Sequence, residues 1–132
     1  MTVRIVDDVL YGADDVVDEW MALKLGKRSA VPFTALGIVS GERLVLGAKF
    51  FNEYSSDITI AMVASPESGF KRRAFARLMA YPFNQLGLPR VTAEIPLSNT
   101  QSIRAAQWLG FVREGVKRRA AADGGHVGVF GL

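Results

Sequence analysis

The sequence predicts an α/β domain with a central mixed, mostly antiparallel twisted sheet flanked by helices. Segments with strand-like alternation and segments with helical periodicity follow one another along the chain, in the order β-α-β-β-β-α-β-α-β-β. The 132 residues are a common size for one domain, and 49% hydrophobic against 22% charged residues favour a folded core and exclude disorder. We therefore expect a single domain over residues 1–132 with a sheet of about seven strands.

The first half of the chain predicts a strand, a helix and a three-stranded meander. Residues 2–6 alternate as a short strand, and residues 12–25 place apolar side chains at helical spacing. Asp14 lies in the first turn of this helix and Lys24 in the last, which is the charge order that a helix dipole favours. Three strand-like runs come next, at 34–39, 44–51 and 57–64, and a tight-turn sequence at 40–43 joins the first two. These runs predict an antiparallel meander.

The second half predicts two helices, a strand and a closing hairpin. Pro82 is expected to kink or divide the first helix, because proline lacks the amide hydrogen that a helix interior uses. Ser98 and Gln101 have the spacing of a capping box that begins the second helix, and Gly110 ends it. The expected elements are a helix over 70–87, a strand over 91–95, a helix over 99–109, and strands over 113–119 and 126–130.

Several classes of site are excluded by composition. The sequence contains no cysteine and one histidine, so disulfides, a thiolate nucleophile and cysteine metal sites are excluded, and we expect no metal. No apolar run is long enough to span a bilayer and no signal-peptide pattern begins the chain, so we expect no membrane partner and a cytoplasmic location.

Charge is distributed unevenly along the chain. Residues 1–69 contain 6 Lys or Arg and 10 Asp or Glu, whereas residues 70–132 contain 10 and 3, so the halves carry −4 and +7. A basic half favours an anionic partner, either nucleic acid or a phosphorylated cofactor, although it also fits a solvated surface. The acidic start of the first helix, at Asp14, Asp15, Asp18 and Glu19, either attracts a cationic acceptor or is a solvated face.

The segment from Ser65 to Ala74 predicts a strand end followed by a helix N-terminus rich in positive charge. Free backbone N–H groups at the start of a helix bind phosphate, and Lys71, Arg72 and Arg73 can neutralise it. The alternative is that a serine caps the helix and the three cations are solvated.

The segment 98–115 contains an ordered string of residues: Asn99, Ser102, Ile103, Leu109-Gly110-Phe111 and Glu114-Gly115. This string resembles the last helix and following strand of the GNAT-type N-acetyltransferase superfamily, whose pattern is Asn-x-x-Ser or Ala, an aliphatic residue, then Leu-Gly-Phe and Glu-Gly. Residues 81–87 and 90–93 look like compact members encoded by tailed phages and prophages. The order of elements is also that of the family, so the resemblance covers nearly the whole chain.

The resemblance implies a sheet splayed between its fourth and fifth strands, with acetyl-CoA as cosubstrate in the splay. It implies that Ala61, Met62 and Val63 line the pantetheine, and that Asn99 and Ser102 contact the cofactor arm or the thiol end. The pyrophosphate would lie at the helix start, on Phe70, Lys71, Arg72, Arg73 and Ala74. Members of the family are often homodimers.

Two positions depart from the family. The pyrophosphate loop, Gln/Arg-x-x-Gly-x-Gly/Ala, aligns as Gly69-x-x-Arg72-x-Ala74, so an arginine replaces a glycine. The tyrosine that protonates the leaving thiolate in many members aligns with Ala106. Acyl transfer to an amine does not require a dedicated acid, because positioning two bound substrates supplies much of the acceleration.

The candidate catalytic residues are Glu53, Glu94 and Ser102. Glu53 and Glu94 are each a candidate general base or a solvated carboxylate, and Ser102 either donates to the thiol sulfur or bonds to its own backbone. His126 titrates in a suitable range, but a histidine in a closing hairpin is also a structural residue.

The sequence thus predicts an acetyl-CoA-dependent N-acetyltransferase that acts on a primary amine by direct attack in a ternary complex. The acceptor would be a protein N-terminus or lysine, a small amine or a modified nucleotide. The alternative is a catalytically inactive GNAT-fold protein that binds a host protein or a nucleic acid. A third hypothesis is a nucleic-acid binder that uses residues 71–73 and 117–119.

Overall fold

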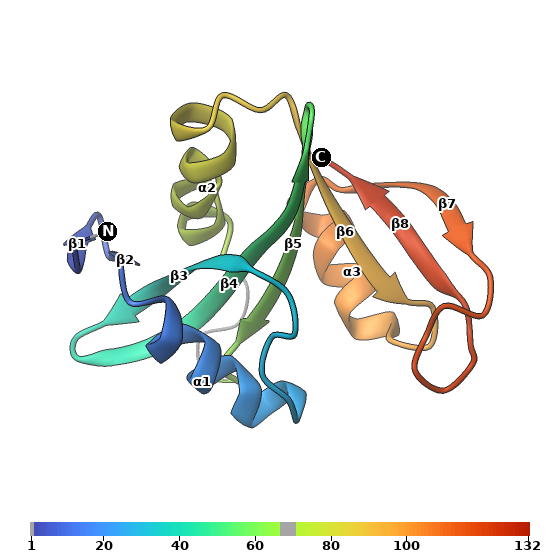
Figure 1. Ribbon diagram of the computed structural model, residues 1–132, viewed down its shortest axis with the longest axis horizontal. Helices are drawn as coiled ribbons and strands as arrows, with labels where there is room; N and C mark the ends of the chain where they lie inside the picture. The colour runs from blue at the N-terminus through green and yellow to red at the C-terminus, as the bar shows by residue number, and fades with distance from the viewer. Residues whose placement is uncertain (1, 67–70) are drawn as a thin grey trace.

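The structure is a computed structural model that describes residues 2–66 and 71–132. Eight strands form one sheet in the order β1-β2-β3-β4-β5-β6-β8-β7, and three α-helices and a short π-helix cover its two faces (Figure 1). The elements are β1 (Arg4–Val6), β2 (Val9–Tyr11), α1 (Asp14–Leu25), β3 (Phe33–Ser40), β4 (Arg43–Tyr54), β5 (Asp57–Ala64), α2 (Arg72–Ala80), η1 (Tyr81–Gln85), β6 (Arg90–Pro96), α3 (Thr100–Leu109), β7 (Val112–Lys117) and β8 (Val127–Gly131). The predicted fold class is confirmed, with eight strands in place of about seven.

The additional strand comes from the N-terminus, where the predicted strand over 2–6 is followed by a second one. Asp7 and Asp8 both have positive φ, 52° and 66°, and the Val6–Val9 pair closes the turn between β1 and β2. A two-residue turn of this type matches the twist of the strands that flank it, and Asp tolerates the left-handed region. Helix α1 begins at Asp14 instead of residue 12, since Gly12 has φ +77° and a Cβ there would lie 2.4 Å from the Thr2 carbonyl oxygen.

Strands β5 and β6 are the one parallel pair in the described sheet, and they separate after three register pairs. Asp57, Ile58 and Thr59 pair with Arg90, Val91 and Thr92. The ladder then stops, while β5 continues to Ala64 against β4 and β6 continues to Pro96 against β8. The two strands therefore open as a V, visible in Figure 1. This confirms the splay expected between the fourth and fifth predicted strands.

A cluster of charged side chains ties the closed end of the V. Arg90 Nε lies 3.2 Å from Asp57 Oδ1, and Arg90 Nη2 lies 2.8 Å from Glu114 Oε1. Thr92 Oγ1 lies 2.8 Å from both carboxylate oxygens of Asp57. The hydrogen bond to Glu114 raises the pKa of Arg90 and lowers the pKa of Glu114. The cluster thus links β5, β6 and β7 at the three register pairs that join β5 to β6.

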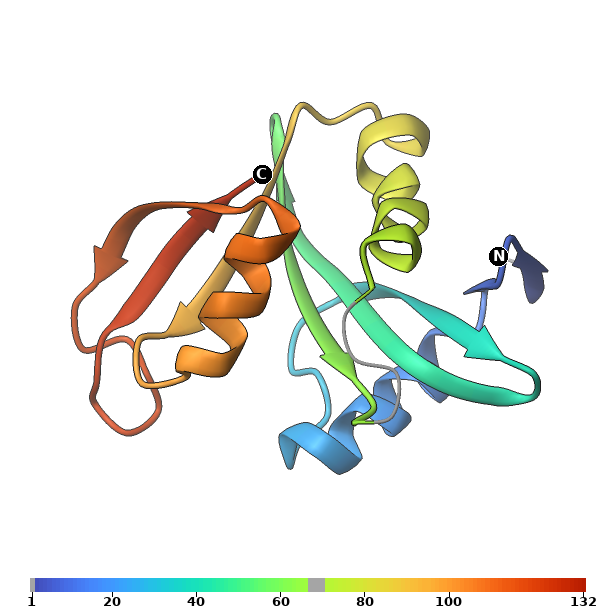
Figure 2. The same cartoon turned by 180° about the vertical axis from the view of Figure 1, so that it is seen from behind.

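The helices divide between the faces of the sheet. Helix α1 packs on one face, where Val17 and Met21 are fully buried against Ala35. Helices α2 and α3 pack on the other face, which holds the larger core, including Phe75, Leu78, Ala106 and Phe130. Figure 2 views the sheet from the side of α2 and α3, with α1 behind it. Within the described residues, no helix is long and apolar enough to cross a membrane.

The acidic side chains at the start of α1 hold this helix on the sheet. Asp18 is 3% exposed, and its Oδ1 lies 3.0 Å from Nζ of Lys49, which is 6% exposed on β4. Burial raises the pKa of Asp18, but the Lys49 ammonium, the Ser29 amide and Arg28 outweigh it and hold that pKa below its ordinary value. The interpretation of Asp18 as part of a solvated or acceptor-attracting face is therefore wrong.

Two predictions about helices in the second half are resolved by the structure. The helix expected over 70–87 is divided at Pro82, which occupies an early position of η1, directly after α2. The capping box at Ser98 is wrong by one residue. Asn99 is the N-cap of α3, and its side-chain oxygen accepts a hydrogen bond from the Ser102 amide at 3.2 Å.

Candidate functional site

A cavity of about 210 Å³ lies where β5 and β6 diverge. Strand β5 forms one wall, β6 forms the opposite wall, and one face of α3, from its N-cap to its last residue, closes it from the side of the larger core. The lining residues are Leu25, Ile60, Ala61, Met62, Ala93, Glu94, Ile95, Pro96, Asn99, Ser102, Ala105, Ala106, Leu109 and Phe111. We call it the splay cavity.

Strand β5 contributes both side chains and a backbone edge to the splay cavity. Ala61 and Met62 line it, whereas the Val63 side chain packs against the α1 core. Because the β5–β6 ladder stops at Thr59, residues 60–64 have no partner strand on the β6 side among the described strands. A strand edge of this kind presents N–H and C=O groups that an extended ligand with amide groups can pair with.

Helix α3 presents a polar first turn and a face of small residues to the splay cavity. Asn99 and Ser102 line it, and the cap bond between them fixes the start of the helix against β6. Of the α3 residues in the lining, Ser102 alone carries a hydroxyl, followed by Ala105 and Ala106. Ala106 is 7% exposed, so the position aligned with the family's tyrosine carries only a methyl group at the cavity wall.

The candidate bases differ in position. Glu94 lines the splay cavity, and Lys117 Nζ donates to its carboxylate oxygens at 3.0 and 3.1 Å. Glu53 is exposed near the end of β4, within an irregular stretch of the β4–β5 pairing, and is not among the lining residues. His126 Nδ1 accepts a hydrogen bond from the Arg119 amide at 3.0 Å, which supports a structural role in the closing loop.

The cations expected at the start of α2 point to its two flanks. Arg72 turns toward α3, where its Nη2 donates to the Trp108 carbonyl oxygen at 2.7 Å and its guanidinium lies 4.6 Å from the centre of the Trp108 ring. Trp108 is 49% exposed, so this contact between α2 and α3 lies at the surface. Lys71 is the N-cap residue of α2 and makes no side-chain cap bond. Phe70 lies outside the described residues.

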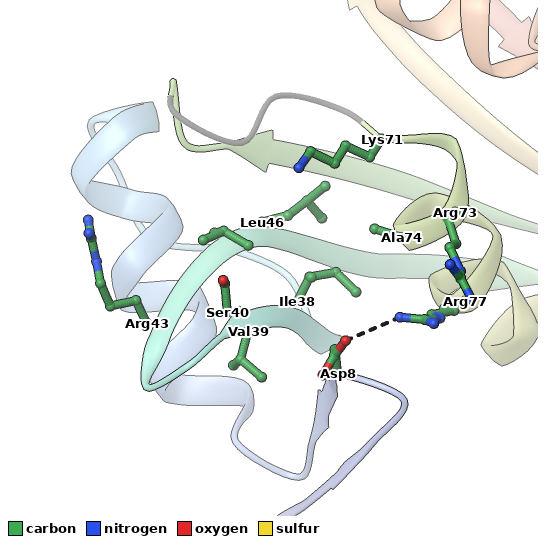
Figure 3. Close-up of a pocket in the computed structure, with 11 residues that line it drawn as sticks. Asp8, Ile38, Val39, Ser40, Arg43, Leu46, Lys71, Arg73, Ala74 and Arg77 are labelled. Atoms are coloured by element: carbon green, nitrogen blue, oxygen red, sulfur yellow. Dashed lines mark hydrogen bonds and ion pairs between the residues drawn. The ribbon is translucent and has the colours of Figure 1, made fainter.

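Lys71, Arg73 and Ala74 line a second cavity, of about 470 Å³, on the other flank of α2. Figure 3 shows these residues and Arg77 on one side of it, facing apolar side chains of β3 and β4. Arg77 Nη1 pairs with Asp8 at 3.2 Å across the opening. Cations around an apolar floor suit an anionic ligand with an apolar body, and we call this the basic cavity.

Sequence reasoning missed several residues of these cavities. Leu25, at the end of α1, and Pro96, at the end of β6, line the splay cavity although neither carries chemistry that marks it. The α3 face was detectable, because Ser102, Ala106 and Leu109 follow helical spacing. Within the described residues, no group of three or more His, Cys, Asp or Glu side chains is arranged to hold a metal ion.

A family model for the acetyltransferase (GNAT) domain matches residues 11–112. The chain belongs to the GNAT acetyltransferase family. The match spans α1, the whole splay and α3, which are the elements that form the splay cavity. A comparison with curated protein sequences found no match.

Solved GNAT-fold structures share the architecture at low sequence identity. The ribosomal-protein-S5-alanine acetyltransferase from Vibrio fischeri is 14% identical, with a TM-score of 0.71, covering 100% of this chain and 96% of that one. A chimera of the spermidine N-acetyltransferase SpeG from Vibrio cholerae and hSSAT is 15% identical, with a TM-score of 0.72, covering 100% and 95%. A GNAT-family acetyltransferase from Streptococcus pneumoniae is 10% identical, with a TM-score of 0.71, covering 94% and 96%. These similarities establish the fold.

Proposed function

We propose that this protein is an acetyl-CoA-dependent N-acetyltransferase that transfers an acetyl group to a primary amine by direct attack in a ternary complex. The observation that carries the proposal is the splay cavity, which joins the free edge of β5 to the first turn of α3. Acetyl-CoA has an extended arm with two amide groups and a phosphorylated end. A strand edge next to a basic helix start offers partners to both.

In this proposal the arm of acetyl-CoA lies along residues 60–64 of β5, and Ala61 and Met62 contact it. Asn99 and Ser102 approach from α3, where the Ser102 hydroxyl is positioned to donate toward the sulfur. The phosphates lie at the start of α2. Lys71 and Arg73 contribute charge from the basic cavity, which has room for the adenosine end. Arg72 contributes indirectly: its hydrogen bond to the Trp108 carbonyl oxygen holds the start of α2 against the end of α3.

The chemistry then follows from positioning. A neutral amine attacks the thioester carbonyl carbon, the carbon–sulfur bond breaks, and the leaving thiolate takes a proton. Holding both reactants in one cavity converts a bimolecular reaction into an effectively unimolecular one. With no cysteine in the sequence, direct transfer is the simplest route. Glu94, on the cavity wall, is the carboxylate best placed to accept a hydrogen bond or a proton from the amine.

The acceptor class follows from the neighbours and from the site. Spermidine and an alanine of ribosomal protein S5 are named for two of the similar structures. Spermidine carries primary amines, and an alanine carries one where it is the first residue of a protein. An acidic group on the cavity wall suits a cationic amine, since Glu94 already binds an ammonium group. A protein N-terminus, a small polyamine and an amine-bearing modified nucleotide are therefore the acceptors to test first.

Calorimetric titration with acetyl-CoA, with dephospho-CoA for comparison, tests the proposed cosubstrate. Arg73→Glu should weaken acetyl-CoA binding roughly tenfold or more, because it replaces attraction to phosphate with repulsion. Arg104→Glu makes the same charge change at an exposed position of α3 outside both cavities, and should have little effect. Equal affinities for the two variants would refute the placement of the phosphates, and absence of acetyl-CoA binding by the folded protein would refute the proposed function.

Two observations favour a second candidate, a family member that binds CoA without catalysing transfer. Arg72 occupies a loop position at which the family commonly has glycine, and it is engaged by Trp108. Ala106 supplies no acid at the position of the usual tyrosine. Acetyl-CoA binding with no turnover across the amine panel would establish this candidate, whereas turnover of any amine would remove it.

A further inference from the structure

A primary amine of the protein itself is paired with a residue that lines the splay cavity. Lys117 is the last residue of β7, and its Nζ lies 3.0 and 3.1 Å from the two oxygens of Glu94, which lines the cavity. The two side chains are 55% and 36% exposed, so both remain accessible to solvent. Exposed ion pairs contribute little to stability, so this pair is not explained by a need to hold β7 in place.

Strand register sets the position of the amine. Strand β8 lies between β6 and β7, with Val129 paired to Glu94 on one side and to Gly115 on the other. A Cβ at Gly115 would meet no atom within 4 Å, so no side chain at this position of β7 blocks the approach across β8. Lys117 lies two residues further along the same strand, and its Nζ reaches the Glu94 carboxylate across β8.

The amine also lies on the appropriate face of the sheet. Ala93 and Ile95 of β6 pack in the core beneath α2 and α3, so the intervening Glu94 belongs to the opposite face. The proposed route of acetyl-CoA begins at the start of α2 and enters the splay cavity from the α2 and α3 side. Glu94 and Lys117 therefore lie on the face of the sheet opposite to the one from which acetyl-CoA enters. An acceptor amine on that face can reach the acetyl group without crossing the path of the cofactor.

We propose that Lys117 is acetylated in cis by acetyl-CoA bound in the splay cavity, an inference that rests on the proposed function. The Lys117 ammonium first loses one proton to Glu94 or to water. Its lone pair then forms the carbon–nitrogen bond to the thioester carbonyl carbon, and the carbon–sulfur bond breaks. The second proton leaves the nitrogen and protonates the CoA thiolate. The products are acetyl-lysine, CoA with a free thiol and one released proton.

Acetylation would change the cavity wall. An acetylated lysine has no charge and no longer binds a carboxylate as an ion pair, so Glu94 would be released. An external cationic amine would then find the carboxylate unoccupied. Lys117 in this view is both an internal acceptor and the group that keeps Glu94 occupied until the cosubstrate has bound.

The test is a time course of the purified protein with acetyl-CoA, followed by intact mass measurement and peptide mapping. Lys24, in the last turn of α1, and Lys27, just after it, are exposed and are not among the lining residues of either cavity, so they report the rate of spontaneous acetylation in the same sample. Lys117 should be modified at least about tenfold faster than either, because it is held beside the bound thioester. The first-order rate constant should be independent of the protein concentration, as expected for a reaction within one molecule, and excess CoA should lower it.

Two variants sharpen the test. Lys117→Arg keeps a cation for Glu94 but removes the acceptor, so the rapid modification should disappear while acetyl-CoA binding is retained. Glu94→Gln removes the charge that holds the amine and should slow modification of Lys117 several-fold, with Lys24 and Lys27 unchanged. Acetylation of all three lysines at one rate would overturn the proposal, as would a protein that acetylates an added amine and leaves Lys117 unmodified. The second result leaves the proposed function standing. Failure to bind acetyl-CoA would overturn both.

Discussion

The buried pair of Asp18 and Lys49 provides the sharpest test of how α1 is held on the sheet. Replacing Lys49 with Met keeps most of the side-chain volume and leaves the Asp18 carboxylate, 4% exposed, without its closest cation. The remaining partners are distant, with Arg28 Nε at 3.4 Å and the Ser29 amide at 3.3 Å, and Arg28 is 58% exposed. Breaking a buried pair by removing one partner costs about 3–5 kcal/mol, and we expect about 3 kcal/mol here because Arg28 compensates in part.

The assay is urea unfolding at neutral pH, supported by thermal denaturation, in which this loss corresponds to a fall in Tm of roughly 10 °C. The control is the double variant Asp18→Leu with Lys49→Met, in which no charge is left buried. It should recover to within about 1 kcal/mol of the parent, since apolar replacement of both members of a buried pair is often neutral. A single variant as stable as the parent, or a double variant no more stable than the single one, would refute the reasoning.

Three further predictions concern pH, packing and capping. The folded pKa of Asp18 lies below its ordinary value of 3.8. The difference in the free energy of unfolding between the parent and Asp18→Leu should therefore be complete above pH 3.8 and shrink as the pH falls through the lower folded pKa. Acid titration followed by circular dichroism would detect this change. Gly47→Ala should lower the free energy of unfolding in urea by about 1–3 kcal/mol, because its Cβ would lie 2.7 Å from Cγ of Met21 on α1. Gly115→Ala, where a Cβ meets open space, should leave that free energy nearly unchanged. Asn99→Ala should lower the free energy of unfolding by about 1 kcal/mol and Ser98→Ala should leave it unchanged, and the reverse order would show that the cap has been placed wrongly.

Much of the fold was predictable because periodicity and turn residues agree along most of the chain. The meander, the division at Pro82 and the end of α3 at Gly110 follow from local chemistry alone. The N-terminal hairpin was missed because Asp7 and Asp8 form its turn, a pair that signals such a turn more weakly than Asn-Gly does. The cap of α3 was misplaced by one residue because neighbouring Ser and Asn side chains are both good N-caps, and only the exit of the chain from β6 selects between them.

The candidate site was predictable where the residues lie on one element and not where elements meet. Ala61, Met62, Asn99 and Ser102, which the resemblance to the family grouped together, line one cavity, whereas Val63 packs against the α1 core. Their role in binding a cofactor stays a prediction. The contact of Arg72 with Trp108 joins residues 36 positions apart, and nothing local indicates it. The burial of Asp18 had a signal that went unused, since the one cation inside the apolar run of β4 needs a buried partner, and an acidic residue on a helix is the natural one.

The short β5–β6 ladder also bears on the solubility of the protein. A strand that lacks a neighbour is normally a hazard, because its free amide groups template pairing with another chain. Here the unpartnered stretch at 60–64 faces the inside of the V, with α3 covering one side and β6 opposite. Another molecule's strand cannot approach it without entering that space. The fold can therefore leave a strand edge open for a ligand without offering that edge to a second copy as a site of aggregation.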